Sequence, residues 1–265
     1  MSRIPAVFIS DVHLKGVDDP RTAPFAEFLR SWKGKADAMF IVGDLFDFYY
    51  GFKDVIYWQH LPAFAAFEEL VRSGMRVGYI EGNHEFRIAE AFRGALGIET
   101  WATDAEITIA GKRILLTHGD LADPKDYGYR FLHWALRNRL TASIAGVMPP
   151  SLAMIAARIA SDGSRAYAIG RGEKLTALFR EKAKTAIGTG FDAVIFGHSH
   201  FPIVETLTEN GHTGTFANCG DWVENFTHLT FDGTAFTLGR SDRPTGAGAP
   251  RSTPGPSDPR NLRVG

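Results

Sequence analysis

Three short apolar runs in the first third of the chain each end in a turn that carries acidic, amide or imidazole side chains. Residues 5–10 (PAVFIS) lead into DVH, residues 37–42 (DAMFIV) into GDLFD, and residues 75–80 (MRVGYI) into EGNHE. Uninterrupted apolar runs of this length are typical of strands buried on both faces of a parallel sheet. Helical patterns lie between them, at Phe25–Trp32 and roughly at Leu61–Arg72, so the order strand–helix–strand predicts βαβ units.

The later part of the chain has a different pattern, in which pairs of apolar runs flank short polar turns. AEITIA and RILLTHGD are joined by GK, PIVETLT and TGTFANCG by ENGH, and THLTF and TAFTLG by DG. Such pairs indicate β-hairpins. Together with the βαβ units they predict a mixed α/β architecture with two packed sheets. Residues 241–265 are rich in Pro, Gly, Ser and Arg without periodicity, so we expect a disordered tail there.

Composition is that of an ordinary globular protein and excludes several classes. The 265 residues are 45% hydrophobic and 22% charged, and a formal net charge of -1 gives no general attraction for nucleic acid. The single cysteine, Cys219, rules out an internal disulfide and is expected in the core. The N-terminus lacks the apolar segment of a signal peptide, and no run of about 18 uncharged apolar residues could span a membrane. We therefore expect a cytoplasmic protein.

Side chains with metal-binding atoms follow the expected strands. They are Asp11, His13, Asp44, Asn83, His118, His198 and His200. Taken singly, each has an ordinary explanation, such as a helix cap for an Asp or a turn for an Asn. Taken together they predict a site, because ligands of α/β sheets bind at the carboxyl ends of strands. Oxygen and imidazole donors without thiolate suit Mn, Fe, Zn or Co, and seven suffice for two divalent ions that share one carboxylate.

The motifs D-x-H, G-D, G-N-H-E, H-G and G-H-x-H follow one another in an order that resembles the calcineurin-like metallophosphoesterases. The resemblance covers most of residues 5–240 and implies a four-layer αββα sandwich. It implies that Asp11, His13 and His200 hold the first metal, that Asn83, His118 and His198 hold the second, and that Asp44 bridges them. It gives His84 the role of a catalytic acid or electrostatic group beside the ions.

Two further acidic residues, Asp47 and Glu85, lie close to these motifs. Either residue can orient a metal ligand through a hydrogen bond, or face solvent. We expect solvent for both.

A long insertion separates THGD from FGHSH. Residues 125–185 contain eleven Lys or Arg and four Asp or Glu, a net charge of +7. YRFLHWALRNRL places Leu132, Ala135, Leu136 and Leu140 along one side of a helix, and SLAMIAARIA places Leu152, Ile155, Ala156 and Ile159 along one side of another. We predict a phosphoesterase domain over residues 1–240, interrupted at 125–185 by a helical cap.

Two interpretations of the cap stay open. Amphipathic helices most often pack their apolar side on the body of a protein and leave their arginines in water. A cap that is apolar inside and basic outside also suits an anionic lipid. Each methylene of an acyl chain that the cap buries contributes roughly 0.8 kcal/mol, so several of them together outweigh an exposed ion pair, which contributes about 0–1 kcal/mol. The second interpretation is favoured, and it predicts peripheral attachment to the inner face of the inner membrane.

The stretches FISDVHL, IVGDLFDFY, DYGYR after HGD, and NCGDWVENFTHL are similar to one branch of the family, the UDP-2,3-diacylglucosamine diphosphatases of lipid A synthesis. This resemblance implies hydrolysis of UDP-2,3-diacylglucosamine to UMP and the lipid 1-phosphate, with manganese as the expected metal. It implies substrate contacts from Asn83, His84, Asp126 and Tyr129. That branch usually has Arg where this chain has His84.

Three other classes stay open. A soluble phosphodiesterase or phosphatase for nucleotides or other small phosphoesters is expected to have a polar insertion. A nuclease is expected to have a basic stripe with interleaved aromatic residues, whereas much of this insertion is aliphatic. A binding scaffold without catalysis is expected to have lost metal ligands, and none is lost here. We therefore expect an enzyme with no nucleic-acid partner.

Overall fold

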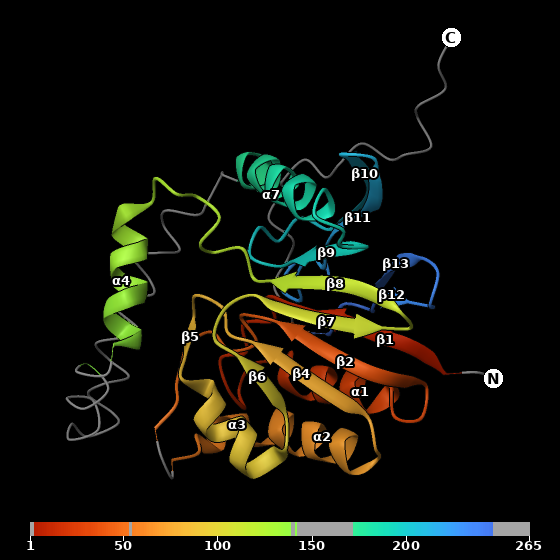
Figure 1. Cartoon of the computed structure of the whole chain (residues 1–265). Helices are drawn as coiled ribbons and strands as arrows, with labels where there is room; N and C mark the ends of the chain where they lie inside the picture. Colours follow the sequence, from red (N-terminus) through yellow and green to blue (C-terminus); the bar gives the residue numbers. More distant parts are fainter. Residues whose placement is uncertain (1–2, 53–54, 139–140, 142–171, 246–265) are drawn as a thin grey trace.

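The computed structural model describes residues 3–52, 55–138, 141 and 172–245, in which two sheets pack against each other (Figure 1). The first sheet has six strands in the order β13-β12-β1-β2-β4-β6. Its strands are β1 Ile4–Ile9, β2 Ala36–Val42, β4 Arg76–Ile80, β6 Glu99–Trp101, β12 Thr227–Phe231 and β13 Phe236–Arg240. β1, β2, β4 and β6 are parallel, and β12 runs antiparallel to both β1 and β13.

The second sheet has five strands in the order β10-β11-β9-β8-β7. Its strands are β7 Ala105–Ile109, β8 Lys112–Thr117, β9 Ala193–Phe196, β10 Ile203–Glu209 and β11 His212–Asn218. The three central strands are parallel, and β7 and β10 are added at the two edges by hairpins. A separate pair of short parallel strands is formed by β3 Tyr49–Tyr50 and β5 Glu85–Phe86.

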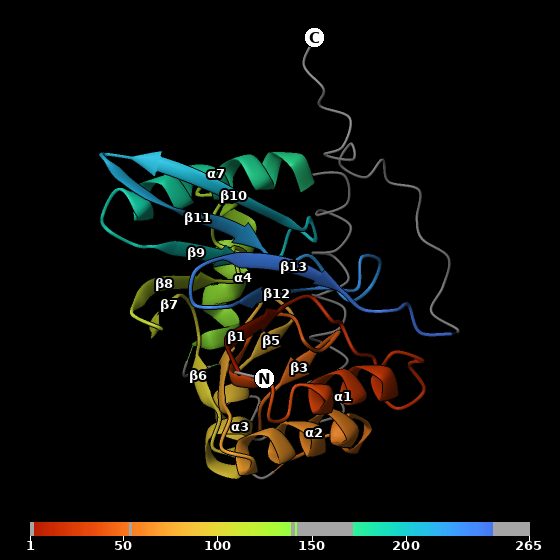
Figure 2. The same ribbon diagram turned by 90° about the vertical axis from the view of Figure 1, so that its right-hand side faces the viewer.

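Helices cover the outer faces of the two sheets (Figure 2). Those on the first sheet are α1 Thr22–Ser31, α2 Leu61–Arg72 and α3 Ile88–Leu96, with a short 3-10 helix, η1 Trp58–His60, before α2. The second sheet carries α7 Gly172–Ile187, and α4 Tyr127–Arg137 stands beside the sandwich (Figure 1). The order helix, sheet, sheet, helix confirms the αββα sandwich.

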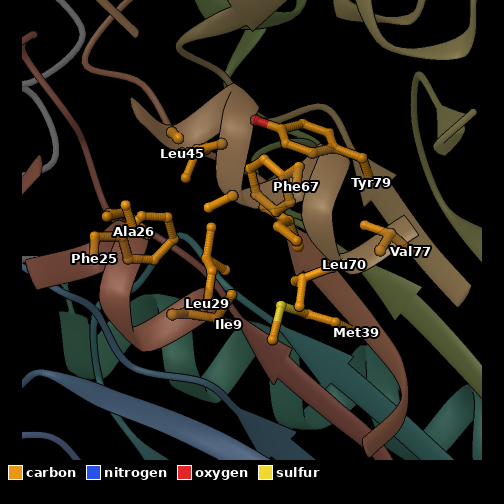
Figure 3. Packing of buried hydrophobic residues seen from close by; sticks show 14 of the residues in the cluster. Ile9, Phe25, Ala26, Leu29, Met39, Leu45, Phe67, Leu70, Val77 and Tyr79 are labelled. Carbon is orange, nitrogen blue, oxygen red and sulfur yellow. The ribbon is translucent and has the colours of Figure 1, made fainter. Parts of the chain in front are cut away.

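The alternation of side chains along β1 explains why these layers form. Val7 and Ile9 face the helices on one side of the first sheet, while Ala6 and Phe8 face the second sheet. Figure 3 shows the helix-facing layer, in which Ile9 and Met39 of the strands meet Phe25, Leu29, Phe67 and Leu70 of α1 and α2. Each such side chain contributes about 1.5–3 kcal/mol when fully buried, so both faces of the central strands stabilise the frame of the site.

Most elements expected from the sequence are confirmed. The three apolar runs form β1, β2 and β4, the helical patterns form α1 and α2, and the hairpins form β7–β8, β10–β11 and β12–β13. The short elements β3, β5, β6 and α3 were not expected, because segments of two to nine residues give little periodicity. The last two hairpins belong to different sheets, since β12 pairs with β1.

Part of the expected cap and most of the expected tail lie outside the described residues. This applies to Leu140, to the helix expected at 151–160 and to the tail from 246 onward, so these features and the domain boundaries stay predictions. The first cap helix is present as α4, with Leu132, Ala135 and Leu136 half-buried along one side. In the ranges that the structure describes, no helix has the length and apolar character needed to cross a membrane.

Candidate metal centre

Five loops, one after each of β1, β2, β4, β8 and β9, bring the metal-binding side chains to one end of the two sheets. Asp11 and His13 follow β1, Asp44 follows β2, Asn83 follows β4, His118 follows β8, and His198 and His200 follow β9. Five of the seven have a left-handed backbone, with φ of 55° at Asp11, 49° at His13, 55° at Asp44, 65° at His198 and 59° at His200. Such conformations cost about 1–3 kcal/mol each and persist where the surrounding structure enforces them, which is typical of functional sites.

Asp11, His13 and His200 form a first group. His13 Nε2 lies 3.3 Å from His200 Nε2 and 3.9 Å from Asp11 Oδ1, and His200 Nε2 lies 3.3 Å from the same oxygen. Asp11 is fully buried, and its Oδ2 accepts a hydrogen bond from the His198 backbone N–H at 2.9 Å. Asp11 Oδ1 has no hydrogen-bond partner in the described part of the chain. A buried, unbonded carboxylate oxygen that faces two imidazole nitrogens is stabilised by a cation.

Asn83, His118 and His198 form a second group. Asn83 Oδ1 lies 3.0 Å from His118 Nε2 and 2.8 Å from His198 Nδ1. His118 Nδ1 lies 2.9 Å from the carbonyl oxygen of Val42. Because a carbonyl oxygen only accepts, this Nδ1 carries a hydrogen, and Nε2 is the atom that a metal would use.

Asp44 lies between the two groups. Its Oδ2 is 3.8 Å from His13 Nε2 in the first group and 3.3 Å from His118 Nε2 in the second. Its Oδ1 accepts a hydrogen bond from the backbone N–H of His84 at 2.9 Å, so the carboxylate is held in one orientation. The ligand atoms of Asp11, His13 and His200 lie within 4.8 Å of one another, as do those of Asp44, His118 and His198. The geometry therefore suits two ions that share Asp44.

Burial and mutual charge shift the pKa values of these groups in opposite directions. Burial alone would raise the pKa of Asp44, but His118 and His84 outweigh it and hold that pKa well below its ordinary value. Burial raises the pKa of Asp11, since nearby histidines offset only part of the effect. Burial would lower the pKa of His118, but the charge of Asp44 raises it to about 10.

His84 lies beside the two groups. Its Nε2 is 3.9 Å from Asp44 Oδ2, and its ring meets the His13 ring edge-on at 4.8 Å between centroids. Its Nδ1 lies 2.8 Å from the carbonyl oxygen of Asp47, so Nδ1 carries a hydrogen and Nε2 is turned toward the centre. Asp47 itself is half-buried, and its carbonyl oxygen is the atom that contacts His84.

The expectation that Glu85 faces solvent is wrong. Glu85 is fully buried, and its carboxylate accepts hydrogen bonds from the backbone N–H groups of Asp44 at 3.1 Å, Phe46 at 2.9 Å and Gly82 at 3.3 Å and from the Tyr79 hydroxyl. Burial and the charge of Asp44 raise the pKa of Glu85 to about 8. Glu85 thus ties the turn after β2 to the turn after β4.

Two positioning residues were not found from the sequence. Arg21 is buried and donates to the carbonyl oxygens of Val12 at 2.8 Å and His13 at 2.7 Å. Asn225 Nδ2 donates to the carbonyl oxygen of His200 at 3.0 Å. Arg21 contacts the backbone of the loop after β1, and Asn225 contacts backbone far away in the sequence. Residue type and spacing therefore do not identify either residue from the sequence.

Asp126 and Tyr129 have different places at the start of α4. Asp126 caps the helix, since its Oδ1 accepts from the Tyr129 backbone N–H at 3.0 Å. The Tyr129 hydroxyl donates to Asp120 Oδ2 at 2.5 Å. Asp120 stands two residues after His118; burial would raise its pKa, but His118 and His198 hold it below its ordinary value. Substrate contacts by Asp126 and Tyr129 stay predictions.

The donor set fits borderline divalent cations. It contains carboxylate, amide and imidazole atoms and no thiolate, because Cys219 is fully buried in the core and burial raises the pKa of its thiol. The core position of Cys219 was expected from the sequence.

Comparisons with known proteins identify several that are similar to this chain. The family model described as calcineurin-like phosphoesterase matches residues 4–202. A protein of Ectopseudomonas mendocina named UDP-2,3-diacylglucosamine hydrolase is 31% identical over 87% of this chain and 95% of its own, and one of the same name from Xanthomonas axonopodis is 30% identical over 88% and 97%. Among solved structures, a predicted phosphoesterase from Streptococcus pneumoniae is 14% identical over 90% of this chain and 88% of its own, with a TM-score of 0.38.

Proposed function

The chain belongs to the calcineurin-like phosphoesterase family and is a hydrolase, and we propose that it hydrolyses UDP-2,3-diacylglucosamine. Addition of water between the two phosphates yields UMP and the lipid 1-phosphate. The observation that supports this chemistry is the convergence of seven side chains with metal-binding atoms from five loops, in two groups with Asp44 between them. The substrate is suggested by the names of the relatives, which the chain covers almost in full.

The proposed ligands are divided as the two groups lie. Asp11, His13 and His200 would hold one ion, Asn83, His118 and His198 the other, and Asp44 both. Manganese is the proposed metal, because carboxylate and amide oxygens suit it as well as imidazole does. When bound, such ions polarise a phosphoryl group and activate a water molecule at neutral pH.

His84 is proposed to act on the substrate directly. The Asp47 carbonyl oxygen fixes the ring through Nδ1 at 2.8 Å, which leaves Nε2 directed toward the metal centre. In its protonated form His84 donates from Nε2 to a phosphoryl or leaving-group oxygen, where negative charge develops. Asn83, the preceding residue, would keep its amide oxygen on the second ion.

Helix α4 supports a lipid substrate and a place at the membrane surface. Tyr127, Phe131 and Trp134 follow one another at spacings of four and three residues and are 76%, 67% and 60% exposed. Exposed aromatic side chains on one side of a helix favour the interface of a membrane. The net charge of +7 over residues 125–185 adds attraction to anionic lipids of about 1 kcal/mol per Lys or Arg near the surface. We propose peripheral attachment at the cytoplasmic side.

Release of UMP from UDP-2,3-diacylglucosamine by the purified chain tests this function. We expect release with manganese, loss of release with a chelator, and recovery when manganese is restored. UDP-N-acetylglucosamine, which has the same headgroup without two long acyl chains, serves as the matched control and should be hydrolysed far more slowly. Equal rates on both would favour a soluble nucleotide phosphodiesterase, and a chain that binds manganese but cleaves neither would contradict the proposal.

A further inference from the structure

Arg137, in the last turn of α4, joins this helix to the turn that follows β4. Its Nη2 lies 2.9 Å from Glu81 Oε2 and donates to the carbonyl oxygen of Glu85 at 3.2 Å. Its Nη1 donates to the carbonyl oxygen of Ala102, after β6, at 2.8 Å. The guanidinium also lies over the Phe86 ring, 5.4 Å from the centroid. One side chain of the cap therefore holds both ends of a turn in the body.

The ion pair between Arg137 and Glu81 is largely withdrawn from solvent. The two side chains are 15% and 3% exposed. The second carboxylate oxygen of Glu81, Oε1, accepts from the backbone N–H of Ile88 at 2.7 Å, which fixes the carboxylate at the start of α3. A buried carboxylate needs a partner, and removal of one member of a buried pair leaves an uncompensated charge. The planar fork of an arginine can reach acceptors on several segments at once, whereas a lysine ammonium is a single point charge.

The turn that Arg137 holds at both ends contains Asn83 and His84. Asn83 Oδ1 faces His118 and His198, so a small displacement of the turn moves one corner of the second group. We propose that Arg137 is a positioning residue, which makes the site of the second ion depend on the docking of α4. This inference rests on the metal centre of the proposed function. It assigns Arg137 no contact with substrate.

The change Arg137→Ala tests the proposal through metal binding. We expect the second manganese ion to bind about 10–100-fold more weakly, the usual cost of removing a group that orients a metal ligand, while the first ion binds normally. Titration followed by the electron paramagnetic resonance of free manganese separates the two ions. With bis(p-nitrophenyl) phosphate at saturating manganese, kcat should fall and KM should stay the same. Arg130→Ala is the matched control, since Arg130 lies on α4, is exposed and contacts the Leu121 carbonyl oxygen at 3.3 Å.

A double change separates positioning from stability. Arg137→Met with Glu81→Gln removes the cation and the buried charge together, so the thermal midpoint should return toward that of the wild type while the second ion stays weakly bound. Arg137→Lys keeps a cation near Glu81 without the full set of carbonyl contacts, so its affinity for the second ion should be intermediate. Wild-type affinity for the second ion in Arg137→Ala, or its full recovery in the double variant, overturns the proposal. A wild-type chain that binds fewer than two ions contradicts the proposed function instead.

Discussion

The five loops of the metal centre and helix α4 meet at the same place but are held in different ways. In the loops the acidic groups Asp11, Asp44 and Glu85 are almost entirely buried and are oriented by backbone N–H groups. Helix α4 has no fully buried residue, and its contacts with the body include polar ones from Tyr129 and Arg137 and apolar packing of Leu136 against the cluster that contains Phe86. The loops are therefore fixed by buried hydrogen bonds, whereas the helix is held at its surface by a few polar contacts and by partly buried apolar side chains. We expect the loops to carry the reaction and the helix to take part in substrate selection.

The same comparison separates the expected effects of mutations. A change in the loops should reduce hydrolysis of every phosphoester, since all substrates need the same metal centre. A change on the exposed side of α4 should affect the lipid substrate alone.

Replacing Asp44 by Ala should have the largest effect. It removes the one carboxylate that both groups share, so we expect loss of both ions and of activity on all substrates. Metal analysis by mass spectrometry and circular dichroism check that the ions are lost while the fold is retained. An Asp44→Ala protein that keeps near-normal activity would contradict a shared ligand.

Replacing His84 by Ala should have the next largest effect. We expect kcat to fall by about 10²–10⁴, the usual contribution of a general acid–base group, with two ions still bound. The comparison of metal content with kcat is decisive, because His84 also lies near His13 and Asp44. A loss of metal in this variant would mean that His84 is a ligand.

Replacing Glu85 by Gln should have a smaller effect on the same substrates. The carboxylate accepts four hydrogen bonds around the turns that carry Asp44 and Asn83, and an amide can satisfy only part of them. We expect kcat to fall by about 10–100-fold, as for other groups that orient metal ligands. Steady-state kinetics on lipid and on bis(p-nitrophenyl) phosphate should give equal losses, and a loss confined to the lipid would place Glu85 in substrate selection.

The sequence predicted the frame and the proposed ligands better than the contacts that orient them. Apolar runs located β1, β2 and β4 because both faces of these strands are buried, and the motif order pointed to residues that the structure brings together. The burial of Glu85 was missed because EGNHE is polar and two of the four partners of Glu85, Asp44 and Phe46, lie about forty residues away. The pair of Glu81 and Arg137 was missed for the same reason, since long-range packing decides which charged residues meet.

The separation between the loops and α4 is tested most directly by changing the aromatic side of the helix. Phe131→Ser and Trp134→Ser together remove two large side chains, each of which contributes about 1.5–3 kcal/mol when buried. If they enter a membrane or contact acyl chains, kcat/KM on UDP-2,3-diacylglucosamine in vesicles should fall about tenfold or more, since 1.4 kcal/mol corresponds to a factor of ten. The measurement is the ratio of kcat/KM on this lipid to kcat/KM on bis(p-nitrophenyl) phosphate, with metal content checked in the same samples. We predict a lower ratio with two ions bound and unchanged hydrolysis of the small diester. An unchanged ratio would contradict a substrate-selecting role for α4.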